Sequence, residues 1–176
     1  VCFAVAVKYS VLLLLRNPKI PLINYQFSMA RVHSYLNFNG NCDEAFRHYQ
    51  QVFKCERMSL MRYRDLPADP KYHISKADLE KVMHTSIMIS PEAMLMGSDV
   101  IKTFGHKFSS GNNFHVMLHA ECANEAKKLF AALSKDALEI ETPLGPTFFS
   151  DLFASFRDKF GVSWMINYTN RSPMES

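Results

Sequence analysis

Glycine is scarce in this chain, and its few positions exclude several nucleotide-binding folds. The 176 residues include six glycines, and none belongs to a GxGxxG fingerprint, a P-loop or a GxSxG elbow. A methyltransferase that binds S-adenosylmethionine in the usual way needs a glycine-rich turn between a strand and a helix of a parallel sheet. Only Gly40 stands between an expected strand and an expected helix. The sequence therefore argues against this class of enzyme.

Cysteine is also infrequent, and its spacing is uninformative about metals. The four cysteines are Cys2, Cys42, Cys55 and Cys122, and no two of them form a CxxC pair. Their spacing indicates neither a zinc knuckle nor a disulfide framework. Reduced thiols are typical of cytosolic proteins, so we expect a cytoplasmic location.

Long runs of basic or apolar residues are absent as well. The chain has 20 Lys and Arg against 17 Asp and Glu, a net charge of +3. It has no basic run of the kind that follows a phosphate backbone, so nucleic acid is not an expected partner. No apolar run approaches the ~20 residues of a membrane-spanning helix, so no membrane partner is expected.

The first 28 residues differ in character from the rest. Two short apolar runs flank Lys8-Tyr9-Ser10, and the basic region and cleavage site of a signal peptide are both unconvincing. We interpret residues 1–28 as a leader that is non-native or disordered, with a targeting segment as the alternative. We expect a single folded domain over residues 29–169 and a polar tail over residues 170–176.

Residues 35–53 contain the clearest structural signal, a strand, a tight turn and an amphipathic helix. Residues 32–38 alternate in polarity as a strand does, and Gly40 ends the alternation. Asn41 is expected to cap the helix that follows. The apolar stripe of this helix consists of Ala45, Phe46, Tyr49, Val52 and Phe53.

The pattern of residues 31–99 predicts one β-α-β-β-β module, whose first strand and helix lie in residues 32–53. Three further strands are expected, at residues 56–63, 84–89 and 93–96. A short helix is expected at residues 75–82, and a loop over residues 99–112.

A second β-α-β-β-β module is expected over residues 113–169. Its strands are predicted at residues 114–119, 137–142, 148–157 and 162–168, and its helix at residues 123–133. An offset of 81 residues aligns Glu44-Ala45 with Glu125-Ala126, and an offset of 69 aligns Met96 with Met165. The pattern indicates a duplicated module and an α+β fold.

Five blocks of sequence resemble a known family. They are YLNFNGNCDEAFRHYQQVF, LMRYRDLP, IMISPEAMLMGSD, SGNNFHVML and FGVSWMINY. From about Arg31 to Tyr168 the chain is similar to the PhnB-like branch of the glyoxalase/bleomycin-resistance/dioxygenase superfamily, which has the vicinal oxygen chelate fold. This branch often carries the label 3-demethylubiquinone-9 3-methyltransferase-like, but the scarcity of glycine argues against methyl transfer. The resemblance implies two βαβββ half-barrels around a cleft, and a homodimer.

The resemblance also implies positions for a metal. In metal-dependent members of the superfamily, His and Glu side chains on the first and last strands of each module hold a divalent ion. Here the first-strand positions fall at or beside His33 and His115, which suit Zn, Fe or Ni. The last-strand positions fall near Met96 and Met165, whose thioethers are poor ligands for these metals. Two histidines lining a metal-free pocket are the favoured interpretation, and a divalent metal is the alternative.

Other residues are candidates for chemistry or binding. His84 is a candidate general base, with a hydrogen-bonded structural histidine as the alternative, and Asp99 is the carboxylate nearest to the metal position. The expected ligand pocket consists of His33, Met96, Asn113, His115, Phe149 and Met165. Core packing of the half-barrels, and turn formation at Asn113, are the alternatives.

The expected function is to bind a small, partly apolar ligand in the cleft. One alternative is a metal-dependent lyase, isomerase or ring-cleaving dioxygenase of the same superfamily. Another is a non-enzymatic protein that sequesters a drug, as in bleomycin-type resistance.

Overall fold

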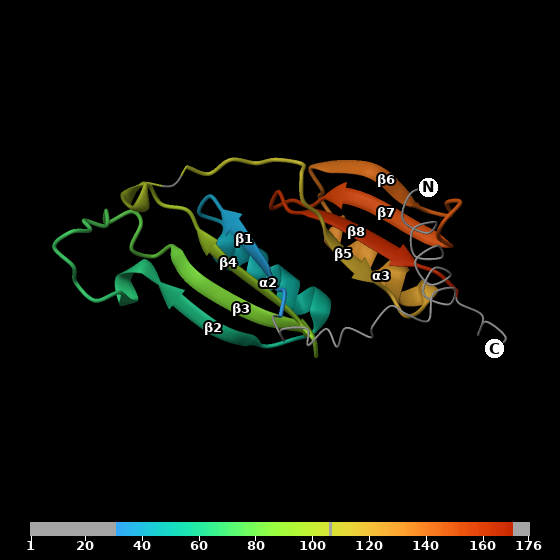
Figure 1. The fold of residues 1–176 in the computed structure, drawn as a ribbon, viewed down its shortest axis with the longest axis horizontal. Coiled ribbons are helices and arrows are strands. Elements are labelled where there is room, and N and C mark those ends of the chain that lie inside the picture. Colours follow the sequence, from blue (N-terminus) through green and yellow to red (C-terminus); the bar gives the residue numbers. More distant parts are fainter. Residues whose placement is uncertain (1–30, 106, 171–176) are drawn as a thin grey trace, which may run out of the picture. The chain divides into compact units, whose positions relative to one another are not determined.

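The computed structural model describes residues 31–105 and 107–170. The leader expected at residues 1–28 and residues 171–176 of the expected tail lie outside these ranges. From Val32 onward the chain belongs to one unit, which contains two four-stranded sheets (Figure 1). No helix in the described ranges is both long enough and apolar enough to cross a bilayer.

The first module has the expected β-α-β-β-β order. Its elements are β1 (Ser34–Phe38), α2 (Cys42–Phe53), β2 (Arg57–Arg62), β3 (Val82–Ser90) and β4 (Ala93–Asp99). The strands lie in the order β1-β4-β3-β2. β1 runs parallel to β4, and the other neighbours are antiparallel.

The second module repeats this arrangement. Its elements are β5 (Val116–His119), α3 (Ala123–Leu133), β6 (Glu139–Gly145), β7 (Leu152–Arg157) and β8 (Ser163–Tyr168). The order β5-β8-β7-β6, with β5 parallel to β8, matches the first sheet strand for strand. The α+β fold with two similar modules is therefore confirmed.

Each helix packs against one face of the sheet of its own module. The apolar stripe of α2 places Ala45, Phe46 and Tyr49 in the core with no exposed surface. Phe46 lies so close to β4 that a Cβ atom on Gly97 would be 2.6 Å from its ring. Glycine is thus required at position 97 because the Phe46 ring lies close to the backbone there, and not because the chain turns.

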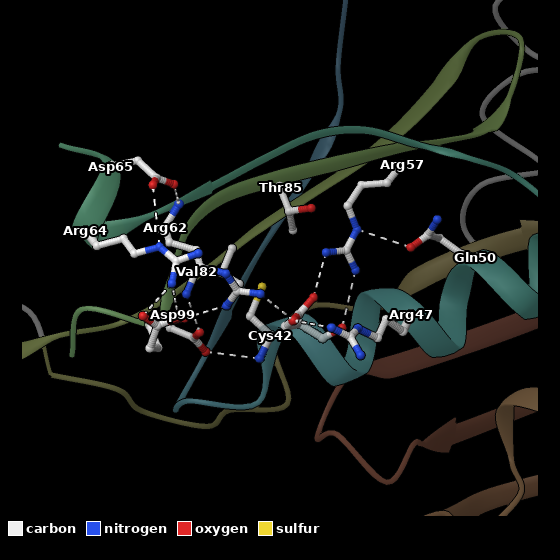
Figure 2. Close-up of polar contacts among 12 residues, drawn as sticks. Cys42, Arg47, Gln50, Arg57, Arg62, Arg64, Asp65, Val82, Thr85 and Asp99 are labelled. Atoms are coloured by element: carbon white, nitrogen blue, oxygen red, sulfur yellow. Dashed lines mark hydrogen bonds and ion pairs between the residues drawn. The ribbon is translucent and has the colours of Figure 1, made fainter. Parts of the chain in front are cut away.

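The N-terminus of α2 is capped differently from the prediction. Asn41 makes no side-chain capping hydrogen bond. The buried carboxylate of Asp99 replaces it, because Oδ1 accepts hydrogen bonds from the backbone N–H groups of Gly40 (2.8 Å) and Cys42 (3.0 Å). Its Oδ2 accepts a third from the N–H of Val82 at 2.9 Å, and Figure 2 shows Asp99 near Cys42 and Val82. One side chain at the end of β4 therefore fixes the starts of α2 and β3.

The short helix expected at residues 75–82 does not form. Residues 76–80 are turns, closed by backbone hydrogen bonds from Asp78 to Ser75 and from Lys81 to Asp78. Val82 is fully buried and is the first residue of β3. Because Val82 is buried in β3 and its N–H donates to Asp99, this residue cannot be part of the expected helix. Tertiary contacts thus outweigh the local helix propensity of residues 75–82.

A second buried aspartate joins the two modules. Asp158, in the turn between β7 and β8, accepts hydrogen bonds through Oδ1 from the backbone N–H groups of Phe160 and Val162, both at 2.9 Å. Its Oδ2 accepts from Trp164 Nε1–H at 2.9 Å and from Tyr49 O–H at 2.6 Å. Tyr49 belongs to α2, 109 residues earlier in the chain. Burial, and then the Asp158 charge, raise the pKa of Tyr49 well above its usual value, so it stays a donor.

The substitution Tyr49→Phe should lower the free energy of unfolding by about 2 kcal/mol, because a buried carboxylate loses one of its donors. Urea unfolding measures this change. The control is Tyr35→Phe, since Tyr35 is half-exposed and its hydroxyl group lies 3.5 Å from the nearest partner; its cost should be below about 0.5 kcal/mol. If Tyr49→Phe and the wild type have the same free energy of unfolding, the hydrogen bond between Tyr49 and Asp158 does not stabilise the fold.

A cluster of ion pairs holds α2 to β2. Asp43 in the first turn of α2 pairs with Arg57 at 2.6 Å, with Arg62 at 2.8 Å and with Arg47 at 3.0 Å. Arg57 also donates a hydrogen bond from Nε to Gln50 at 3.1 Å (Figure 2). Burial opposes ionisation of Asp43, but the hydrogen bonds from Arg57 and Arg62 outweigh it and lower its pKa to about 2.

This shift makes the contribution of Asp43 to stability depend on pH. Its folded-state pKa of about 2 lies below the ordinary value of 3.8. The stabilisation is therefore present above about pH 4 and is lost as the pH falls through 2. Asp43→Asn should be about 2 kcal/mol less stable than wild type at pH 7, and this difference should shrink between pH 4 and pH 2.

Urea unfolding at a series of pH values measures the Asp43 effect. The control is Glu92→Gln, which removes an exposed carboxylate and should leave stability unchanged at every pH. A destabilisation by Asp43→Asn that is the same at pH 7 and pH 2 would contradict the role of the carboxylate charge.

Candidate functional site

The face of each sheet that its helix leaves uncovered, here called the open face, carries several of the predicted site residues, among them Met96 and Met165. On β1 the buried side chains of Leu36 and Phe38 lie on the helix side, and the half-exposed Tyr35 lies on the other side. Alternation along a strand and register between strands then define rows of side chains across each open face. Each row therefore shows which residues, far apart in the sequence, are neighbours in space.

The central rows of the two modules correspond to each other. In module 1 the central row is Tyr35, Met96, Ser86 and Ser59. In module 2 it is Met117, Met165, Ser155 and Thr142. Met96 and Met165 thus occupy equivalent places on β4 and β8, and each is followed by a serine on the next strand.

The polar groups of module 1 form short, separate contacts. Ser59 and Ser86 are joined by a hydrogen bond of 2.6 Å between their hydroxyl groups. His84 lies one row away, with its Nδ1 3.5 Å from the Tyr35 hydroxyl. His33, just before β1, accepts a hydrogen bond at Nδ1 from the backbone N–H of Met94 at 3.4 Å. His33 and His84 therefore lie in different rows and share no partner.

Module 2 brings three polar side chains together on one carboxylate oxygen. Nε2 of His115 lies 3.1 Å from Oε2 of Glu141, and the Ser155 hydroxyl group donates a hydrogen bond to the same oxygen. His115 precedes β5, at one edge of the sheet, whereas Glu141 is on β6, at the other edge. The two side chains meet across the open face.

Glu141 and Ser155 were missed by the sequence analysis. The register between β6 and β7 shifts between Ile140 and Thr142, and simple alternation does not anticipate this bulge. The signal available in the sequence was the offset of 69 residues, which aligns Ser86 with Ser155 as it aligns Met96 with Met165. The hydrogen bond from Ser155 is the main cause that lowers the pKa of Glu141; burial opposes it, and the bond from His115 adds to it. Glu141 is therefore ionised at neutral pH.

The remaining predicted residues are dispersed. Asp99 is 2% exposed, and its two oxygens already accept three backbone hydrogen bonds, which is a structural role. Phe149 is half-exposed and packs edge-to-face with Phe148 and Phe153, at centroid distances of 5.0 and 5.2 Å. Within residues 31–105 and 107–170 no three His, Cys, Asp or Glu side chains converge in a way that could hold a metal.

Asn113 lines a cleft between the two modules. The cleft has a volume of about 230 Å³, and its walls include Tyr35 of β1, Phe114 before β5 and Ser163 of β8. An adjoining cavity of about 400 Å³ shares Asn37 with it. The predicted pocket residue Asn113 is thus at a concave surface where small molecules have room.

Comparison with known proteins places this architecture in a family. A family model described as 3-demethylubiquinone-9 3-methyltransferase matches residues 30–167. The chain belongs to this family. The crystal structure of PA1353 from Pseudomonas aeruginosa is 31% identical, with a TM-score of 0.70, and the match covers 80% of this chain and 98% of that chain.

Two more distant structures show the same fold. A PhnB protein from Bacillus cereus is 24% identical, with a TM-score of 0.63, over 80% of this chain and 100% of that chain. A variant of the fosfomycin resistance protein FosX from Listeria monocytogenes, in complex with Mn(II) and 1S,2S-dihydroxypropylphosphonic acid, is 10% identical, with a TM-score of 0.51, over 79% and 91% of the two chains. The family model carries the label that the sequence blocks led us to expect, and these two structures confirm the expected glyoxalase-like fold.

Proposed function

We propose that this PhnB-like protein binds a small, partly apolar ligand at the open faces of its sheets, without a resident metal. The observation that supports this proposal is the pair of equivalent central rows, in which Met96 and Met165 stand beside serine hydroxyl groups. Thioethers adapt to irregular apolar and aromatic surfaces, and hydroxyl groups orient a ligand by hydrogen bonding.

The donor set favours binding without a metal. FosX binds Mn(II) in a related fold, and the superfamily resemblance puts His33 and His115 at metal positions. In this chain the positions on β4 and β8 hold methionine, a soft ligand that suits Mn, Zn or Fe poorly. Nε2 of His115 is occupied by Glu141. Divalent metal that survives dialysis in stoichiometric amount, and is lost in His115→Ala, would instead support the metal-dependent alternative.

Titration with indole tests the ligand site, with the methionine methyl groups labelled with ¹³C for NMR. The methyl resonances of Met96 and Met165 should shift on binding, because both side chains lie on the open faces. Met165→Gln should weaken the affinity for indole about threefold or more, since a buried apolar contact is replaced by an amide.

The control for this titration is Met58→Gln. Met58 is 60% exposed and belongs to neither central row, so its loss should not change the affinity. Shifts confined to methyl groups outside the open faces, or none at all, would count against the proposed site.

We also propose that two copies of the chain associate through their open faces. Tyr35, Met61, Met117 and Phe149 are each more than 40% exposed, and the first three lie on these faces by strand register. Exposed apolar side chains grouped on one face are typical of an association surface. A second copy would cover them and deepen the ligand site.

Light scattering measures the assembly directly. The wild type should have twice the chain mass at micromolar concentration. Met61→Lys combined with Met117→Lys should be monomeric, because a charged side chain on each open face disfavours its burial. Met58→Lys is the control and should stay dimeric. A monomeric wild type would overturn the proposed homodimer.

A further inference from the structure

A cavity of about 370 Å³ lies beside the loop that joins β2 to β3. This loop spans residues 63–81 and supplies most of the wall, and Met83 of β3 and Phe104 of the 3₁₀ helix η2 (Lys102–Phe104) complete it. None of the described residues that line it belongs to a central row of the open faces. A concave site of this volume has room for a small organic molecule.

Two aromatic rings form one wall of this cavity. The ring centroids of Tyr72 and Phe104 are 5.0 Å apart, and Phe104 also stacks on Tyr63 at 5.9 Å. Tyr63 is buried, and its hydroxyl group donates a hydrogen bond to the backbone carbonyl group of Asp99 at 2.8 Å. Phe104 is therefore held against the core, whereas Tyr72 is 48% exposed and leaves ring surface available to a ligand.

A turn places a carboxylate beside this wall. The backbone N–H of Tyr72 donates to the carbonyl group of Asp69 at 3.0 Å, and the N–H of Lys71 donates to Oδ1 of Asp69 at 2.9 Å. Asp69 and Tyr72, at the two ends of this turn, both line the cavity. Among the described lining residues Asp69 alone carries a charge, and no described group donates a hydrogen bond to its Oδ2. The cavity is thus mostly apolar with one anionic group at its wall.

We propose that this cavity binds an organic ammonium ion that carries an aromatic group. The ammonium group pairs with Asp69, and the aromatic group packs on Tyr72, Phe104 and Met83. A carboxylate is a strong acceptor for an ammonium donor, and the face of an aromatic ring also attracts a cation. An anionic ligand is disfavoured, because the described lining offers it no Lys or Arg side chain. The site goes beyond the ligand-binding function proposed for the open faces and does not depend on it.

Two probes of nearly equal size test the need for a positive charge. We would label the methionine methyl groups of the full-length protein with ¹³C and titrate it with 2-phenylethylamine, which is protonated at pH 7, and with the neutral 2-phenylethanol. The methyl resonance of Met83 should shift as the amine binds, because this side chain lines the cavity. The wild type should bind the amine about fivefold more tightly than the alcohol, the order expected of one exposed ion pair and one contact between a cation and a ring.

The substitution Asp69→Asn should abolish this preference. Asparagine retains a side-chain oxygen that can accept the N–H of Lys71, so the turn is kept. The control is Asp136→Asn, which removes an exposed carboxylate from module 2 at a φ of 60° that asparagine tolerates. This variant should keep the preference of the wild type. Tyr72→Ala should weaken the affinity for the amine at least threefold, since the ring surface is lost.

An unchanged Met83 resonance in the presence of the amine would overturn the proposal. Equal affinities of the wild type for the two probes, or a preference that survives Asp69→Asn, would do the same. At a salt concentration of about 1 M the preference should shrink, because exposed charges are screened, and a preference independent of salt would contradict the ion pair. The open-face function fails separately, when indole leaves the Met96 and Met165 resonances unchanged.

Discussion

The buried carboxylate of Asp158 is the constraint on which the pairing of the two modules depends. It is fully buried, and an ionised group without water is costly unless its lone pairs are satisfied. Four donors satisfy it: two backbone N–H groups of its own turn, the Trp164 indole and the Tyr49 hydroxyl group. The last donor comes from the other module. Separation of the modules would therefore expose the core around Trp164 and leave this carboxylate short of one partner.

Aromatic packing surrounds this polar centre and gives it a low-dielectric setting. Tyr49 packs edge-to-face on Trp164 and on Phe160, at centroid distances of 5.4 and 5.9 Å. Hydrogen bonds strengthen in such surroundings, but they also become costly to break. The same logic applies to Asp99 in module 1, which satisfies three backbone N–H groups. Each module thus depends on one buried aspartate, although the two occupy different positions in the repeat.

Local sequence rules predicted most of the elements, because their signals lie within a few residues. The stripe of Ala45, Phe46 and Tyr49 correctly predicted α2, and the repeat of residue types predicted the second module. The errors arose where a distant residue decides the local structure. Asn41 satisfies the usual rule for a helix cap, but Asp99, 57 residues beyond Cys42, takes that role. Residues 75–82 have a sequence that is typical of a helix, but Val82 is buried in β3 and the helix does not form.

The candidate site was harder to predict than the fold, for a reason visible in module 2. His115 was found through the family resemblance, which puts it and His33 at the first-strand positions, and the duplication aligned Met96 with Met165. Glu141 was not found, since its position depends on a bulge in β6 and on the approach of two edge strands across the open face.

A duplicated fold preserves strand positions but leaves each copy free to change its polar partners. Module 1 uses the equivalent histidine to bind its own backbone, whereas module 2 directs its histidine to a carboxylate. The likeness of the two copies supports the proposed ligand site on both sheets, whereas their divergence places a histidine–carboxylate contact in the second module.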